Sequence, residues 1–80
     1  MIEYIKDKLQ AEIEGAKVKV TDMTGTNNHF SVEVVSPGFE SKSLIQRHQM
    51  VYRVLNERIS TGEIHALSIT AKTPKEIEVK

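Results

Sequence analysis

The sequence predicts a single α+β domain over residues 1–80, in which helices cover one face of a mixed three-stranded sheet. Two long stretches repeat apolar residues at three- and four-residue spacing, and three stretches alternate apolar with polar residues. They occur in the order helix, strand, strand, helix, strand, with a short helix at the end. Because a helix separates the second and third strands, that pair should be parallel, whereas a short loop lets the first two strands pair antiparallel.

The first half of the chain predicts a helix followed by a hairpin. Apolar residues recur at helical spacing in the first stretch: Ile2, Ile5, Leu9 and Ile13. Gly15 is placed to end this helix. Residues 17–23 and 29–36 each alternate as half-buried strands do, and the turn-forming residues at 24–28 join them.

The second half predicts a helix, a third strand and a short last helix. Residues 36–38, Ser-Pro-Gly, break the second strand, and Ser43 is a suitable cap for the helix that follows. One apolar stripe of this helix should face the sheet: Leu44, His48, Val51 and Leu55. Residues 64–72 should form the third strand, with one face made by His65, Leu67, Ile69 and Ala71. Thr73 then caps a helix that begins at Pro74.

Composition excludes several classes of function. The chain has no cysteine, so soft-metal chemistry here needs histidine, carboxylate or a thiol from another molecule. Acidic and basic side chains cancel to a formal charge of zero, which argues against non-specific electrostatic binding to nucleic acid. No apolar run is long enough to span a membrane, and the first residues do not look like a secretory leader. We therefore expect a cytoplasmic protein.

Two segments with histidines resemble a known family. They are Ser-Leu-Ile-Gln-Arg-His-Gln-Met-Val-Tyr at residues 43–52 and Ile-His-Ala-Leu-Ser-Ile at residues 64–69. With Phe39 ahead of the first and Thr73-Pro74 behind the second, they occur in the order and at the spacing that resemble the BolA family. The resemblance implies a fold similar to class II KH domains. The Gly-x-x-Gly loop with which KH domains clamp nucleic acid has no match in this chain.

The resemblance also implies a function for His65 and His29. From the residues alone, His65 either packs on the core face beside Leu67 or binds a metal. BolA proteins partner monothiol glutaredoxins and share a [2Fe-2S] cluster with them, and His65 matches the family's histidine ligand. His29 follows the loop that carries the other ligand, so it is either that ligand or its neighbour. Glutaredoxin and glutathione would supply the thiolates. The chain alone would be a monomer without a cofactor, and it would form a heterodimer with its partner.

His48 and four basic residues support a different set of expectations. His48 lies on the apolar stripe, where an imidazole hydrogen-bonded to backbone would have a structural role. Basic side chains should line an exposed side of the second long helix: Lys42, Arg47, Arg53 and Arg58. They form either a solvated face or a surface for a partner or for DNA, because the region after Pro37 resembles a helix-turn-helix. No catalytic motif is recognisable, so we expect a protein that is not an enzyme.

Overall fold

The computed structural model describes residues 1–23, 25 and 29–78 of the chain. Its elements follow in the order α1 (Ile2–Glu12), β1 (Lys17–Asp22), β2 (His29–Val35), the 3₁₀ helix η1 (Pro37–Phe39), α2 (Leu44–Ser60), β3 (Ala66–Lys72) and α3 (Pro74–Glu78). The predicted turn at residues 24–28 lies, apart from Gly25, outside the described residues. None of the helices in the described part of the chain has the length and apolar composition that crossing a bilayer requires.

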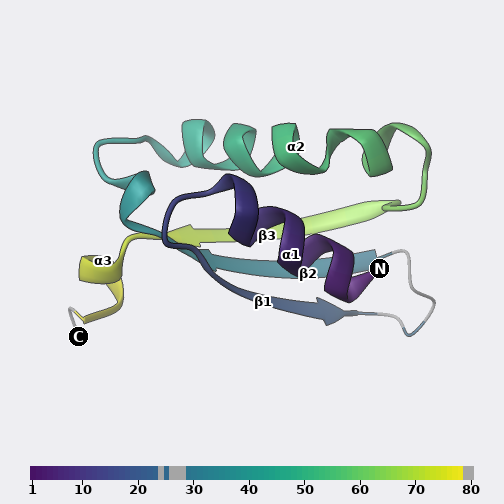
Figure 1. Ribbon diagram of the computed structural model, residues 1–80, viewed down its shortest axis with the longest axis horizontal. Coiled ribbons are helices and arrows are strands. Elements are labelled where there is room, and N and C mark those ends of the chain that lie inside the picture. Colours follow the sequence, from purple (N-terminus) through teal and green to yellow (C-terminus); the bar gives the residue numbers. More distant parts are fainter. Residues whose placement is uncertain (24, 26–28, 79–80) are drawn as a thin grey trace.

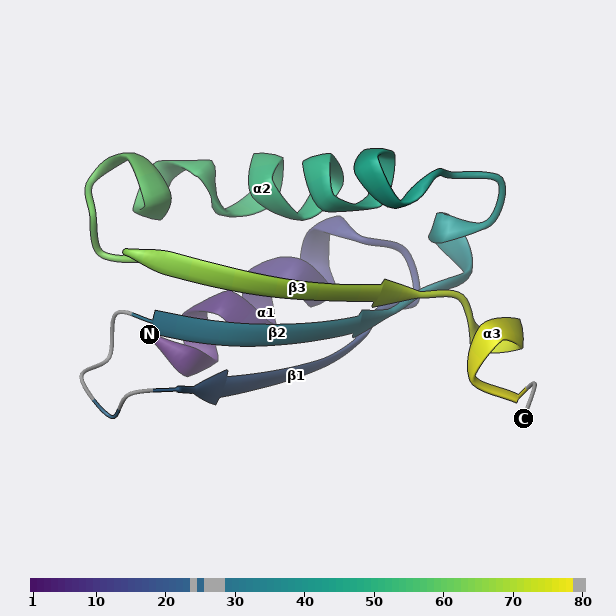
Figure 2. The ribbon, with the colours of Figure 1, turned by 180° about the vertical axis from the view of Figure 1, so that it is seen from behind.

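The sheet is mixed, as the sequence predicts. Its strand order is β1-β2-β3, with β1 antiparallel to β2 and β2 parallel to β3. The helix α1 crosses one face of the sheet, and α2 runs along the β3 side (Figure 1). Seen from behind, the three strands are nearer to the viewer than α1, so this view looks onto the other face of the sheet (Figure 2).

The core lies between the two long helices and one face of the sheet. Its fully buried side chains include Ile5, Leu9, Phe30, Val32, Val34, Val51 and Leu55. The other face is polar, because alternation points hydroxyl and charged residues outward along each strand. Neighbouring residues form rows across it: Thr21, Ser31 and Ser68 in one row, and Lys19, Glu33 and Thr70 in the next. This open face ends at His29, the first residue of β2.

The start of α2 is fixed by the cap that the sequence predicts. The Ser43 hydroxyl accepts a hydrogen bond from the backbone N–H of Gln46 at 3.1 Å, and the Gln46 side chain accepts one from the Ser43 N–H at 2.9 Å. This reciprocal capping box satisfies two N–H groups that the first turn leaves without helical partners. The residue at which α2 begins is therefore set by Ser43.

Two predictions about the buried stripe of α2 are wrong. Leu44 is 65% exposed, although its spacing placed it with Val51 and Leu55. Arg47, expected on the exposed side, is only 7% exposed. The guanidinium of Arg47 reaches past Phe39, with its central carbon 5.9 Å from the ring centroid, and occupies the space that an apolar side chain would have filled.

The third strand begins later than predicted, at Ala66. Ile64 is buried and its N–H donates to the Arg58 carbonyl at the end of α2, so the chain is still turning at this point. Leu67, Ile69 and Ala71 share the core face as expected. His65 does not share it, because it precedes the strand and is exposed.

Candidate metal centre

His29 and His65 lie at the same end of the sheet. His29 opens β2 and pairs with Ala66, and His65 directly precedes Ala66. Because β2 and β3 run parallel, their first residues lie side by side at the same end of the sheet. The strand register therefore brings together two side chains that are far apart in the sequence.

The two imidazole rings are in contact with one another. Their centroids are 5.2 Å apart and their planes differ by 12°, which is a stacked arrangement. His29 is half-buried and His65 is exposed. Imidazole lone pairs lie in the ring plane, so rings stacked in this way do not both point at one metal atom. One ring has to turn about χ2, which is a soft torsion for histidine, and the exposed His65 has room to do so.

This pair cannot complete a metal site by itself. Among the described residues, no group of three or more histidine, cysteine, aspartate or glutamate side chains is placed to hold a metal ion. The chain also has no cysteine. Two imidazoles therefore leave at least two positions of a four-coordinate metal for donors of other kinds or from other molecules. That His29 and His65 bind a metal stays a prediction, although the structure places them side by side.

A shallow cavity of about 310 Å³ adjoins the histidine pair. It is lined by Met23, His29, Phe30, Ala66, Leu67 and Ser68. The Met23 N–H donates to the His29 carbonyl at 2.8 Å, which extends the β1–β2 ladder by one pair and sets Met23 opposite His29. Sequence reasoning missed Met23, although strand alternation beyond Thr21 was a signal that could have found it.

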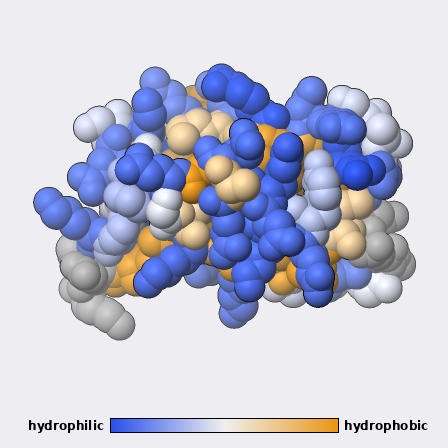
Figure 3. All heavy atoms as spheres, viewed as in Figure 1, coloured by the Kyte–Doolittle hydropathy of each residue, from blue (hydrophilic) through white to orange (hydrophobic). Residues whose placement is uncertain are grey.

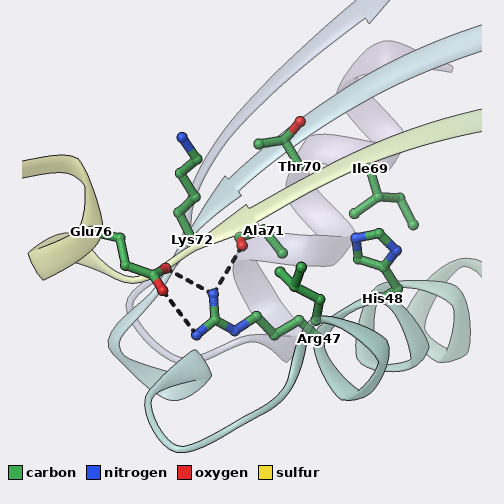
Figure 4. A pocket seen from close by; sticks show the side chains of 8 residues that line it. Arg47, His48, Ile69, Thr70, Ala71, Lys72 and Glu76 are labelled. Carbon is green, nitrogen blue, oxygen red and sulfur yellow. Dashed lines mark hydrogen bonds and ion pairs between the residues drawn. The ribbon is translucent and has the colours of Figure 1, made fainter.

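Arg47 is bound into the fold instead of facing solvent. Its Nε donates to the Lys42 carbonyl at 3.0 Å, and its Nη1 donates to the Ala71 carbonyl at 3.1 Å. The Glu76 carboxylate accepts two further bonds, from Nη1 at 2.8 Å and from Nη2 at 3.3 Å (Figure 4). Glu76 also accepts from the Thr73 N–H, so this cluster joins α2, β3 and α3.

Arg58 is also engaged within the domain. Its Nη1 pairs with Glu63 at 2.9 Å, and its guanidinium carbon lies 4.6 Å from the centroid of the Tyr4 ring. Of the four predicted basic residues, Lys42 and Arg53 remain exposed. The face that carries α1 is largely hydrophilic, with hydrophobic areas in small separate pieces (Figure 3).

The two ion pairs alter the pKa values of their carboxylates. Hydrogen bonds from Arg47, and then from the Thr73 backbone, hold the pKa of Glu76 below its usual value. Hydrogen bonds from Arg58 and Thr61 lower the pKa of Glu63 in the same way. The lowered pKa keeps both carboxylates charged to a lower pH than an unpaired glutamate.

The region after Pro37 does not form a helix-turn-helix. Residues 37–60, all of which the structure describes, contain a three-residue 3₁₀ helix followed by one α-helix. A helix-turn-helix motif needs two α-helices joined by a short turn. The resemblance noted in the sequence is therefore wrong at the level of structure.

His48 lines a second cavity, of about 540 Å³, between the first half of α2 and the end of β3. Its ring lies near Ile69 (Figure 4), and the exposed Leu44 lines the same cavity. The imidazole is half-buried and makes no hydrogen bond to any described residue. The expected hydrogen bond from His48 to backbone is therefore absent among the described residues, and a structural role for His48 stays a prediction.

Comparisons with known proteins agree with the fold. The family model described as BolA-like protein matches residues 5–76. Protein BOLA1, chloroplastic, of Arabidopsis thaliana is 39% identical over 85 residues, which cover 90% of this chain and 52% of that protein. The chain thus spans about half the length of this relative. The DNA-binding transcriptional regulator BolA of Escherichia coli is 35% identical over 83 residues. The match covers 95% of this chain and 78% of that protein.

A solved structure shows the same architecture. The BolA domain of SufE1 from Arabidopsis thaliana superposes with a TM-score of 0.84 at 36% identity, and the match covers 94% of this chain and 93% of that one. The likeness to class II KH domains stays a prediction. From the family match over residues 5–76 and the shared fold, the chain belongs to the BolA-like protein family.

Proposed function

We propose that this chain is an adaptor that binds a monothiol glutaredoxin and shares a labile [2Fe-2S] cluster with it through His65 and His29. Such an adaptor acts in iron–sulfur cluster maturation or trafficking, or in iron regulation. The observation that carries the proposal is the stacked pair of imidazoles at an exposed end of the sheet, 5.2 Å apart between centroids.

The chemistry of the pair fits this role. A [2Fe-2S] cluster takes four ligands, and histidine in place of cysteine on an iron raises its reduction potential. Two imidazoles from this chain leave two positions for thiolates, which a glutaredoxin cysteine and glutathione would fill. Because His65 is exposed, the cluster would sit at the contact between two proteins and not inside either one. Such a position suits transfer to a client protein.

A relative supports an adaptor role. The solved BolA domain of SufE1 is one domain of a larger protein, and SufE-like protein 1 matches this chain over only 24% of its own length. A domain of this fold is thus found covalently joined to other sequence.

The proposal is tested by anaerobic cluster reconstitution with a monothiol glutaredoxin and glutathione. Visible absorption and circular dichroism should show a spectrum that differs from that of the glutaredoxin alone. The His65→Ala variant should abolish this difference, and His29→Ala should abolish or alter it. His48→Ala is the matched control, because His48 lies in a different cavity and should leave the spectrum unchanged. A glutaredoxin spectrum that is the same with and without this chain would refute the proposal.

DNA binding is the alternative that the name of the Escherichia coli relative favours. Two of the four candidate basic residues, Arg47 and Arg58, already pair with Glu76 and Glu63. Few phosphate contacts remain for Lys42 and Arg53, so any binding should be weak and lost at moderate salt. A gel shift of duplex DNA by this chain alone at about physiological salt, weakened in the Lys42→Ala/Arg53→Ala variant, would favour the regulator over the adaptor.

A further inference from the structure

The exposed thioether of Met23 lies beside the histidine pair. Met23 is 62% exposed and packs against none of the core residues, so its side chain is open to solvent. Its N–H bond to the His29 carbonyl makes Met23 and His29 directly opposite neighbours on antiparallel strands. Opposite residues of such a pair project from the same face of the sheet. Met23 and His29 therefore share both a face and the cavity that they line.

Three donor side chains consequently lie near one end of the open face, with His29 as the neighbour of both other residues. His65 stacks on His29, and Met23 directly follows the neighbouring strand β1. The donors are two imidazole nitrogens and one thioether sulfur. The described residues that line the cavity include no carboxylate, and the chain supplies no thiolate.

This set of donors selects for a soft cation. Mg²⁺ and Ca²⁺ require oxygen ligands, and Zn²⁺ in proteins takes imidazole together with thiolate, carboxylate or water. A thioether is a poor ligand for these ions but a good one for Cu(I). We propose that Met23, His29 and His65 form a binding site for Cu(I).

The site is independent of the partner that the proposed function requires. Cluster sharing needs thiolates from another molecule, whereas the Cu(I) site is complete within this chain. The two roles use the same histidines, so Cu(I) and the cluster compete for them. Met23 belongs to the copper site alone, and a Met23→Leu variant therefore separates the two roles. Because Met23 is exposed, this substitution should leave the fold intact.

The first experiment is an anaerobic competition between the chain and the chromophoric chelator bicinchoninate for Cu(I). The wild type should withdraw one equivalent of copper. The Met23→Leu variant should bind at least about tenfold more weakly, since even the loss of an outer-shell contact costs a metal site tenfold or more. Met50→Leu is the matched control, because Met50 is the half-buried methionine of α2 and lines other cavities. Its affinity should equal that of the wild type.

A second readout locates the metal directly. With ¹³C-labelled methionine methyl groups, Cu(I) should shift the resonance of Met23 and leave those of Met1 and Met50 in place. Zn²⁺ at the same concentration should shift the Met23 resonance less than Cu(I) does, because a thioether is a poor ligand for Zn²⁺. The proposal is overturned if the chain removes no copper from the chelator, if Met23→Leu binds copper as tightly as the wild type, or if the Met23 methyl resonance does not move. Met23→Leu should leave cluster formation with a glutaredoxin unchanged. The copper experiments and the cluster reconstitution therefore test the Cu(I) site and the proposed function separately.

Discussion

Replacing Arg47 by methionine should destabilise the domain strongly. The methionine keeps most of the aliphatic volume but removes the guanidinium, which is buried and donates to the carbonyls of Lys42 and Ala71. A hydrogen bond from a charged donor contributes about 1.5 kcal/mol or more, so these two bonds alone account for about 3 kcal/mol. That is a large part of the free energy of unfolding of a small domain, which is on the order of 5–15 kcal/mol.

The assay is urea unfolding followed by circular dichroism at neutral pH. The midpoint should fall in Arg47→Met without a large change in slope, because the fold itself is kept. Arg53→Met is the matched control, since it makes the same substitution at an exposed position of the same helix and should change stability by less than about 0.5 kcal/mol. Equal losses in the two variants would refute the reasoning, because they would show that the buried guanidinium adds nothing.

Three further predictions concern stability. The pKa of Glu76 is lower in the folded chain than in the unfolded chain, so its charged form stabilises the fold fully at pH values above the unfolded-state pKa. This stabilisation is lost as the pH falls through the folded-state pKa. The free energy of unfolding should therefore decrease less steeply with falling pH in Glu76→Gln than in the wild type. Ser43→Ala removes the cap of α2 and should cost about 1 kcal/mol in urea unfolding, whereas a cost near zero would show that the capping box is dispensable. Leu9→Ala opens a cavity in the core and should cost about 2–5 kcal/mol, whereas Leu44→Ala, at an exposed position, should cost far less, and a reversal of that order would contradict the assigned core.

The sequence predicts most of this fold because its local signals agree with one another. Alternation, helical spacing and the Ser43 cap each reflect short-range physics, and the strand directions follow from the length of the connections. Arg47 shows where such reasoning stops. An arginine is buried only when acceptors are supplied, and these come from Ala71 and Glu76, which are distant in the sequence.

The candidate site was predictable only in part. His65 and His29 were chosen by resemblance to a family, and nothing local in the sequence indicates that their rings touch. That contact depends on the register of the parallel pair, in which His29 lies opposite Ala66. Met23 was missed because, although the predicted strand 17–23 includes it, nothing local in the sequence indicates that it lies opposite His29.

The contact between His29 and His65 also ties metal binding to folding. The two residues are held together by the pairing of β2 with β3 across the whole of α2, so an unfolded chain would not keep them in contact. An ion that needs both rings binds the folded chain and not the unfolded one, and it shifts the equilibrium toward the fold by about 2.7 kcal/mol at a concentration one hundred times its dissociation constant. The loaded chain should therefore melt at a higher temperature than the empty one, so its resistance to heat would report on whether the site is occupied.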